Sequence, residues 1–318
     1  MTAAVGIDIG GTKIAAGVVD ESGAILARAR RETPTDDAGK LRDQLNEIFA
    51  ELTDQHPVTA VGVGVAGWVG VDRATVMFAA HLPLRDIALR DQLADDFGLP
   101  VVIENDANVA AWAEHRYGAG VGRFAARSMV MLTVGTGLGG GIVLHGRLLR
   151  GAHGVAAELG HVRVVPDGRP CPCGRRGCLE QYASGRALIV AARDRAQEDP
   201  ASARRLLELA GGDPRLITGL MITVAAADGD IAACGAFADV GHWLGVALAD
   251  LTQVLDPNVF VIGGGVSDAG ELLMAPVRDS YQAALGQRGN YPLAPVLPAG
   301  AGNDAGVIGA ADLARQAG

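Results

Sequence analysis

Three of the chain's four cysteines, Cys171, Cys173 and Cys178, lie in the short segment RPCPCGRRGCLE (169–180). The prolines and glycines between them indicate a turn, which argues against a chance cluster of small core residues. Their C-x-C and C-x₄-C spacings differ from the C-x-x-C pattern of redox motifs, and a disulfide is unexpected in a reducing compartment. Three thiolates held close together suit Zn²⁺, which takes four Cys or His ligands in structural sites.

The fourth ligand of such a site should lie close by in the sequence. His161, ten residues before Cys171, is the expected ligand, and His153 is the nearest competitor. Glu158 precedes His161 by three residues, so both lie on one face if the stretch is helical. A metal bound to one ring nitrogen of His161 orients the other as a hydrogen-bonding group. Glu158 could instead be a solvated helix residue, but we expect it to form a polar wall with His161.

A polar junction ends the buried strand in the segment VVIENDANVAAW (101–112). Glu104, Asn105 and Asp106 lie where the strand gives way to a helix, and ligands of open α/β sheets bind at this carboxyl end. Asn105 or Asp106 could merely cap the helix. A helix N-terminus also favours an ionised carboxylate, which is the form that a general base needs. We expect Asp106 to accept a hydroxyl proton. Glu104 lies two residues before it, and we expect one of the two acids to point elsewhere.

Two glycine-rich turns, DIGGTK (8–13) and GTGLGGG (135–141), could hold phosphate. Glycine lets backbone N–H groups approach an anion closely, and threonine hydroxyls add donors. The turns have hydroxyl or charged side chains beside them at Asp8, Thr12, Lys13, Thr133 and Thr136. A tight hairpin without a ligand is the alternative. The second turn runs into a strand, unlike a Rossmann turn, and the Lys-Ser or Lys-Thr of a P-loop is absent.

The elements that position these segments form two similar halves. Residues 5–28 and 128–151 both follow the order strand, glycine turn, strand, turn, strand, which indicates a weak internal duplication of an α/β unit. A helix over about 36–53 has one apolar face, made by Leu41, Leu45, Ile48 and Leu52. Further helices are expected around 89–97, after 105, across 179–254, after 265 and from about 304. The glycine-rich stretch 118–127 could serve as a hinge.

Composition is that of an ordinary globular protein. The chain has 318 residues, enough for two domains, of which 49% are hydrophobic and 20% charged. Its net charge of −9 argues against a nucleic-acid partner, because nucleic-acid binders normally present a basic surface. We expect no run long and apolar enough to span a membrane, and MTAAVGIDIGG lacks the basic start of a signal peptide. A cytoplasmic protein is therefore predicted.

The segments DIGGTK, LTVGTGLGGG and VFVIGGGV occur in an order that resembles the two phosphate segments and the adenosine segment of the sugar kinase, heat-shock chaperone and actin ATPase fold. The resemblance implies an α/β protein with a duplicated core whose two domains clamp ATP in a cleft. We expect domains at 1–117 and 118–303, with a C-terminal helix at about 304–318 packing back on the first. Asp8 would lie near Mg²⁺, commonly through water. The implied nucleotide contacts are Gly11, Thr12, Thr136, Gly137, Gly264 and Gly265, with Lys13 and Thr133 beside them.

ELGH (158–161) followed by CPCGRRGCLEQYASG (171–185) is similar to the signature of the ROK family, bacterial sugar kinases and their repressor relatives. The motifs match in order from IDIGGTK to GNDAGVIGAA, and the resemblance is greatest to the bacterial glucokinases of that family. It implies ATP-dependent phosphorylation of a hexose, with glucose expected, Asp106 as catalytic base and a dimer or tetramer. The implied sugar contacts are Gly67, Asn105, Asp106, Glu158, His161 and Glu180. The implied ligands of a structural zinc ion are His161, Cys171, Cys173 and Cys178.

Two stretches depart from the family pattern. Ala66-Gly67 stands where Pro-Gly is frequent, and His81-Leu82-Pro83-Leu84 stands where Asn-Leu-x-Trp is common. The replaced Asn and Trp could lie near the cleft. These positions therefore bear on the identity of the sugar and leave the reaction type unchanged.

Other functions fit parts of the pattern. A kinase for another hexose or an N-acetylated hexosamine would differ only in the placement of side chains that read hydroxyl groups. A sugar-responsive regulator would carry a DNA-binding domain before the first phosphate segment, for which we expect no room before Gly6. An ATPase of the chaperone or actin type gives no reason for the group formed by Glu158, His161 and the cysteines.

Overall fold

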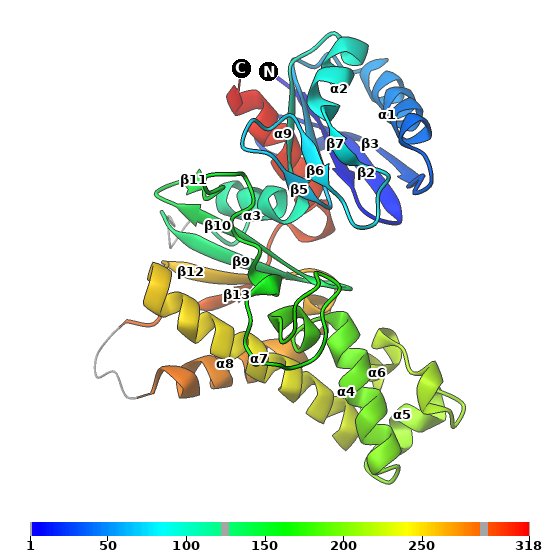
Figure 1. The fold of residues 1–318 in the computed structure, drawn as a ribbon, viewed down its shortest axis with the longest axis vertical. Helices are drawn as coiled ribbons and strands as arrows, with labels where there is room; N and C mark the ends of the chain where they lie inside the picture. The colour runs from blue at the N-terminus through cyan, green and yellow to red at the C-terminus, as the bar shows by residue number, and fades with distance from the viewer. Residues whose placement is uncertain (1, 122–126, 287–291, 318) are drawn as a thin grey trace. The chain divides into compact units, whose positions relative to one another are not determined.

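The computed structural model describes residues 2–121, 127–286 and 292–317, which divide into two compact units (Figure 1). Unit 1 comprises Met1–Met129, Gly141–Ala157 and Gly300–Gly318, and unit 2 comprises Val130–Gly140 and Glu158–Ala299. The domain boundaries expected from the sequence, at 117/118 and 303/304, stay a prediction. Residues 122–126 of the expected hinge lie outside the described residues.

Unit 1 is built on a five-stranded sheet with the order β3-β2-β1-β4-β8. Its strands are β1 (Ala4–Ile9), β2 (Lys13–Val19), β3 (Ile25–Glu32), β4 (Val61–Val65) and β8 (Val101–Asn105). The first three form the predicted antiparallel meander, whereas β4 and β8 run parallel to β1. The register places Asp8 beside Gly64 and Gly64 beside Glu104, so the polar strand ends meet at one edge of the sheet.

Helices cover both faces of this sheet. α1 (Ala38–Thr53) and α2 (Leu89–Phe97) bury their apolar positions in the same core as Ile7 and Ile9 of β1. α9 (Ala305–Ala317) lies on the opposite face, because neighbouring positions of a strand point to opposite sides. A Cβ on Gly6 would lie 1.9 Å from the carbonyl oxygen of Val307, and a Cβ on Gly62 would lie 1.8 Å from that of Ala310. These glycines therefore let α9 pack directly against the strands.

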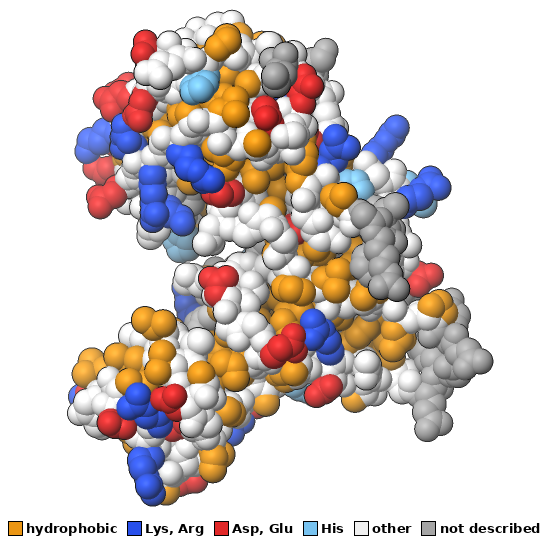
Figure 2. Space-filling model, turned by 180° about the vertical axis from the view of Figure 1, so that it is seen from behind, with side chains coloured by type: hydrophobic (Ala, Val, Ile, Leu, Met, Phe, Trp, Pro, Cys, Tyr) orange, Lys and Arg blue, Asp and Glu red, His pale blue; other side chains and the backbone are white. Residues whose placement is uncertain are grey.

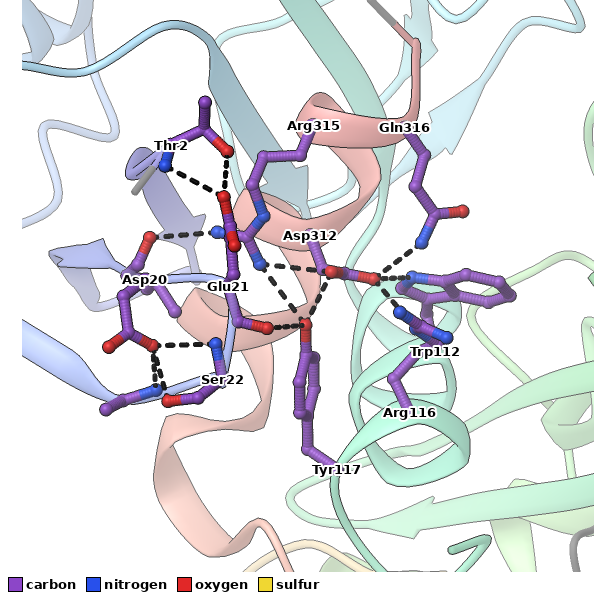
Figure 3. Close-up of polar contacts among 12 residues, drawn as sticks. Thr2, Asp20, Glu21, Ser22, Trp112, Arg116, Tyr117, Asp312, Arg315 and Gln316 are labelled. Atoms are coloured by element: carbon purple, nitrogen blue, oxygen red, sulfur yellow. Dashed lines mark hydrogen bonds and ion pairs between the residues drawn. The ribbon is translucent and has the colours of Figure 1, made fainter.

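A buried carboxylate joins α9 to α3 (Asp106–Arg116), as Figure 3 shows. Asp312 is only 3% exposed and accepts hydrogen bonds from Trp112 Nε1 (2.8 Å), Tyr117 Oη (2.6 Å) and Gln316 Nε2 (2.7 Å). Arg315 lies at 3.0 Å. Burial raises the pKa of Asp312, but the hydrogen bonds from Tyr117, Trp112 and Arg315 outweigh it and hold the pKa below its usual value. The C-terminal helix is thus fixed to the helix that begins at Asp106.

A small three-stranded sheet, β5-β6-β7, was not expected from the sequence. It consists of β5 (Trp68–Val69), β6 (Val76–Phe78) and β7 (Arg85–Ile87). Leu84 precedes β7 and is 1% exposed in the core of unit 1. His81 is exposed beside the first glycine turn, where a Cβ on Gly11 would lie 3.1 Å from its own Cβ. Of these two departures, His81 contacts a predicted phosphate turn, whereas Leu84 is part of the hydrophobic core.

The second five-stranded sheet has the order β11-β10-β9-β12-β13. Its strands are β9 (Met129–Val134), β10 (Leu138–Leu144), β11 (Arg147–Leu148), β12 (Val259–Gly263) and β13 (Val296–Pro298). The helices of unit 2 are α4 (Gly185–Glu198), α5 (Arg204–Leu209), α6 (Gly219–Ala227), α7 (Ile231–Leu255) and α8 (Glu271–Leu285). α7 and α8 lie side by side (Figure 1), and Gly241 and Gly245 of α7 allow close contact with Pro276 and Ser280. The two mixed sheets with their helices make the predicted actin-like ATPase fold.

Helix α7 corrects one expectation from the sequence. It is long and apolar enough to cross a membrane by length and composition alone, with a mean hydropathy of 1.4. Of that window, 56% is buried inside the structure, and α7 packs against α4, α6 and α8. A core helix explains this pattern.

On the face drawn in Figure 2, acidic and basic side chains lie interspersed among exposed hydrophobic ones.

Candidate functional site

The junction of β8 and α3 gives Asn105 and Asp106 different tasks. Asn105 Oδ1 accepts the Asn108 N–H (3.0 Å) and thereby caps α3. Asn105 Nδ2 donates to the Gly67 carbonyl (3.1 Å) and to Asp106 Oδ1 (3.0 Å). The same Asp106 oxygen accepts the Ala107 N–H at 2.9 Å. The capping alternative therefore applies to Asn105, while the Asp106 carboxylate is held at the first residue of the helix by two donors.

Gly67 packs too tightly for any larger residue. A Cβ there would lie 2.6 Å from the Phe78 carbonyl oxygen and 2.9 Å from Ala79 Cβ. Its own carbonyl holds the Asn105 side chain. The predicted sugar contacts Gly67, Asn105 and Asp106 thus form one hydrogen-bonded group in unit 1.

Asp8 lies near the end of β1, just before the first glycine turn, and packs against the start of α9. A Cβ on Gly306 would lie 2.5 Å from Asp8 Cγ, so the helix packs directly on the carboxylate. Burial raises the pKa of Asp8 from 3.8 to about 6, although the nearby Lys13 opposes the shift. The turn closes with a hydrogen bond from the Gly10 N–H to the Lys13 carbonyl (3.0 Å), which leaves the Thr12 and Lys13 side chains exposed.

The second glycine turn and the predicted adenosine segment meet in unit 2. Gly264 has φ +85°, and its missing Cβ would lie 2.6 Å from the Val134 carbonyl oxygen. That oxygen accepts the Val266 N–H at 3.0 Å. The Gly135 carbonyl accepts the N–H of Gly185, the first residue of α4, at 2.8 Å. Thr133 is half-buried and Thr136 and Gly265 are exposed, so the loop presents both side-chain and backbone donors.

Glu180 connects the cysteine segment to this second turn. Its Oε2 accepts the Leu138 N–H at 3.0 Å. A Cβ on Gly137 would lie 2.5 Å from the same oxygen. The predicted sugar contact Glu180 is therefore held by a residue that follows the predicted phosphate contacts Thr136 and Gly137.

The His161, Cys171, Cys173 and Cys178 side chains gather in unit 2 with all four donor atoms within 4.8 Å of one another. His161 Nδ1 lies 3.7 Å from Cys171 Sγ, and Cys173 Sγ lies 3.6 Å from Cys178 Sγ. Ligands at the corners of a tetrahedron around zinc, with bonds of about 2.0–2.3 Å, lie about 3.3–3.8 Å apart. The cluster thus suggests a zinc site, and its histidine is His161 and not the competitor His153.

Loop geometry brings these donors together. Gly177 has φ +77°, and a Cβ there would lie 1.6 Å from the Val165 carbonyl oxygen. Hydrogen bonds from the Val164 N–H to the Gly177 carbonyl and from the Leu179 N–H to the Val162 carbonyl, both 2.8 Å, join the two flanks. The segment after His161 is therefore paired with the segment that carries Cys178.

The thiols differ in acidity. Burial, followed by the neighbouring thiols, raises the pKa of Cys178 to about 12. Burial also opposes ionisation of Cys173, but hydrogen bonds from the backbone and side chain of Arg175 outweigh it and lower its pKa to about 7. Three adjacent thiolates need a cation to balance their charge, and this donor set fits a zinc ion.

Glu158 and His161 face each other across a short 3₁₀ turn, Leu159–His161. Glu158 Oε2 lies 4.0 Å from His161 Nε2, and the other ring nitrogen faces Cys171. The two ring nitrogens of His161 therefore face different partners, as expected: Nδ1 points to the cysteine cluster and Nε2 points to Glu158.

Near Asp106 lies a largely buried group of charged side chains that was not among the predicted site residues. Glu104 lies between Arg73 and Arg150, whose Nε atoms are 3.1 and 2.7 Å from its Oε2. Alternation along a strand does not separate the two acids, because residues two positions apart point to the same side; they differ because β8 ends at Asn105 and Asp106 begins α3, so that Glu104 is the acid that faces the arginines. No sequence pattern identifies the arginines, because they lie in distant segments of the chain.

Comparison with known proteins places the chain in a family. A model described as the ROK family matches residues 4–317. A glucokinase of Streptomyces coelicolor is 48% identical over 313 residues, which covers 98% of this chain and 97% of that protein. An N-acetylmannosamine kinase of Yersinia pseudotuberculosis is 37% identical over 311 residues, 97% of each chain.

A solved structure resembles the whole fold. A ROK family glucokinase from Streptomyces griseus, in complex with glucose and AMPPNP, is 49% identical with a TM-score of 0.88 and covers 99% of each chain. The family model matches nearly every residue, and the donor atoms of His161 and the three cysteines gather in one cluster. The chain belongs to the ROK family.

Proposed function

We propose that this chain is a glucokinase, which transfers the γ-phosphoryl group of ATP to the 6-hydroxyl of glucose. The observation that carries the proposal is the Asp106 carboxylate at the start of α3, held by Asn105 and the Ala107 N–H. It occurs in a chain that is 49% identical to a glucokinase solved with glucose and AMPPNP.

Asp106 acts as the general base of the reaction. It takes the proton of the 6-hydroxyl while that oxygen forms a bond to the γ-phosphorus. The bond between the γ-phosphorus and the bridging oxygen breaks at the same time, and ADP leaves. The two donors on Asp106 Oδ1 keep the carboxylate in one orientation, which a positioned base requires.

The residues assigned to the hexose come from several segments of the chain. Gly67 and Asn105 of unit 1 hold it beside Asp106, and their mutual hydrogen bond fixes the turn that carries Gly67. In unit 2 the sugar contacts are Glu158, His161 and Glu180. Carboxylate and imidazole groups read hydroxyl positions by hydrogen bonds, which is how a kinase discriminates glucose from its epimers.

The nucleotide is bound by the two glycine turns and the adenosine segment. The residues assigned to ATP are Gly11, Thr12, Lys13, Thr133, Thr136, Gly137, Gly264 and Gly265. Asp8 would hold Mg²⁺, and the ion would neutralise charge on the phosphates when bound. A divalent cation favours the ionised form of Asp8, whose burial otherwise favours the protonated form.

His161, Cys171, Cys173 and Cys178 would hold a structural zinc ion. The ion would fix the ring of His161, so that Nε2 and Glu158 keep their positions for the sugar. We further propose that the enzyme works in the cytoplasm as a dimer or tetramer, with a hexose and ATP as its partners. Sedimentation of the purified protein tests the oligomeric state.

A coupled assay of ADP release across a panel of sugars tests the function. The panel contains glucose, mannose, fructose, N-acetylglucosamine and N-acetylmannosamine, with ATP and Mg²⁺ in excess. We expect the largest kcat/KM with glucose. Preference for N-acetylmannosamine would favour the activity named for the Yersinia relative, and no release with any sugar would contradict a kinase.

A further inference from the structure

The proposed mechanism gives no role to Glu104, although this residue has a buried carboxylate. It immediately precedes Asn105, and its side chain is 1% exposed. Arg150 Nε lies 2.7 Å and Arg73 Nε 3.1 Å from Glu104 Oε2. Arg150 is itself only 11% exposed, so this charge cluster lies largely out of solvent, where ion pairs are screened least.

The other oxygen of Glu104 binds the strand–helix junction. Oε1 accepts the Asn105 N–H at 3.0 Å and Asn108 Nδ2 at 3.2 Å. The carboxylate therefore has two functions. One oxygen faces the arginines, and the other holds the two asparagines that flank Asp106 in the first turn of α3.

Arg150 extends the cluster to the turn that follows Gly67. Its guanidinium donates to the carbonyls of Gly70 and Val71, both at 2.8 Å. Gly154, four residues later with φ +91°, packs against the same turn, since its missing Cβ would lie 2.3 Å from the Val69 carbonyl oxygen. The cluster thus connects the β5–β6 turn to the junction that carries the proposed catalytic base, Asp106.

Arg73 reaches Glu104 from an unusual backbone conformation. Its φ is +52°, a left-handed value that costs a non-glycine residue free energy, of order 1 kcal/mol. The Arg73 carbonyl accepts the Ile103 N–H at 3.2 Å, which aligns the turn with the end of β8. Strain of this kind persists where the surroundings hold it, and it gathers at functional sites.

We propose that Glu104, with Arg73 and Arg150, is a positioning group that fixes Asn105, Asp106 and the Gly67 turn relative to one another. The inference rests on the proposed function, since the groups it aligns are the base and the sugar contacts of unit 1. Alignment matters because a misplacement of about 1 Å can lower a rate about 100-fold.

Replacing Glu104 with glutamine tests the proposal. Glu104→Gln keeps the shape and the Oε1 acceptor but removes the charge that faces the two arginines. We expect kcat/KM for glucose to fall about 10- to 100-fold, with ATP KM within about twofold of the wild type. Arg150→Gln should act in the same direction, and the double variant should lose less than the product of the two single losses, because both remove one interaction.

Asp312→Asn is the matched control. Asp312 is also a buried carboxylate of unit 1, and it contacts the far end of the same helix through Trp112 and Arg116. This variant should lower the melting temperature as Glu104→Gln does but keep kcat and both KM values within about twofold. The inference is overturned if Asp312→Asn lowers kcat as strongly as Glu104→Gln, or if Glu104→Gln keeps wild-type kcat and glucose KM.

A measurement without turnover separates this inference from the proposed function. If the wild type phosphorylates no sugar, the proposed function fails, and amide hydrogen exchange then decides the positioning role. Faster exchange at Asn105, Ala107 and Asn108 in Glu104→Gln, but not in Asp312→Asn, supports the positioning role. Unchanged exchange at these amides in Glu104→Gln overturns it.

Discussion

Neighbouring polar residues perform separate tasks in this site. Glu104 is buried between arginines, Asn105 caps α3, and Asp106 presents a carboxylate held by two donors. The sequence predicted the carboxylate at a helix N-terminus and the cysteine cluster with His161, because local spacing determines both. It could not predict Arg73 and Arg150 as partners of Glu104, since that contact depends on how distant segments pack.

The proposed zinc site formed by His161 and the three cysteines gives a first prediction at this scale. Cys173→Ser removes one of four ligands, so zinc content should fall from one ion per chain, measured by metal analysis. Glucose KM should rise more than ATP KM, because the cluster orients the ring of His161 beside Glu158. Cys234→Ser is the control, since Cys234 is exposed on α7 and lies outside the cluster. An equal rise of both KM values would mean that the loop only stabilises the fold.

Asp8 gives a second prediction, on stability against pH. Folding raises its pKa from 3.8 to about 6, so the native state binds the proton more tightly than the unfolded state. The wild type should therefore lose stability as pH rises from about 4 to about 6, by at most about 3 kcal/mol, and then level off. Asp8→Asn should not show this loss of stability, because asparagine does not titrate.

Urea unfolding with EDTA and without nucleotide measures the difference. The stability of Asp8→Asn minus that of the wild type should increase across the same pH window and stay constant at higher pH. A difference that does not change with pH would show that Asp8 ionises as easily in the native state as in the unfolded chain.

At the scale of elements, close packing at glycines brings the predicted segments together. Gly6 and Gly62 lack a side chain and so let α9 pack closely against the first sheet. Gly264 likewise lets the turn after β12 pack closely against the loop after β9. The sequence predicted the strands, the glycine turns and the apolar face of α1, because periodicity and turn residues are local signals. It missed the sheet β5-β6-β7, whose strands of two or three residues are too short to show a period.

Gly264→Ala tests the contact between the adenosine segment and the second glycine turn. The new Cβ would lie 2.6 Å from the Val134 carbonyl oxygen, so the two segments must separate. ATP KM should rise about tenfold, a change of about 1.4 kcal/mol, while glucose affinity stays near that of the wild type. Steady-state kinetics and glucose titration measure the two effects.

Gly229→Ala is the matched control for this variant. Gly229 has φ +84°, almost the same as the +85° of Gly264, but a Cβ there meets nothing within 4 Å. Both variants should lose a similar amount of stability from the left-handed backbone, of order 1 kcal/mol. If Gly229→Ala raises ATP KM as much as Gly264→Ala, the contact with Val134 is not responsible.

At the scale of the whole molecule, the sequence predicted an α/β protein with a duplicated core, and two five-stranded sheets confirm this. The return of the chain to unit 1 at Gly141–Ala157 was not predicted, because it depends on contacts of Arg150 and Gly154 with a distant turn. The sequence analysis also expected no membrane-length apolar run, yet α7 is one by length and composition. Its apolar residues are accounted for by burial against other helices of unit 2.

The environment of α7 leads to a prediction for the intact protein. Because more than half of its apolar window is buried by α4, α6 and α8, the expressed chain should stay in the high-speed supernatant of lysed cells without detergent. Fractionation followed by immunoblotting measures this. Recovery only in the membrane pellet, with release by detergent, would contradict a core role for α7.

The central claim is that Asp106 takes the proton of the glucose 6-hydroxyl, and the kcat of Asp106→Asn tests it most directly. Asparagine keeps the size of the side chain and an oxygen acceptor for the Ala107 N–H, but it cannot accept the hydroxyl proton. We predict that kcat, measured by ADP release with saturating glucose and ATP, falls about 10²- to 10⁴-fold while calorimetry still detects glucose binding. A kcat close to that of the wild type would contradict the account.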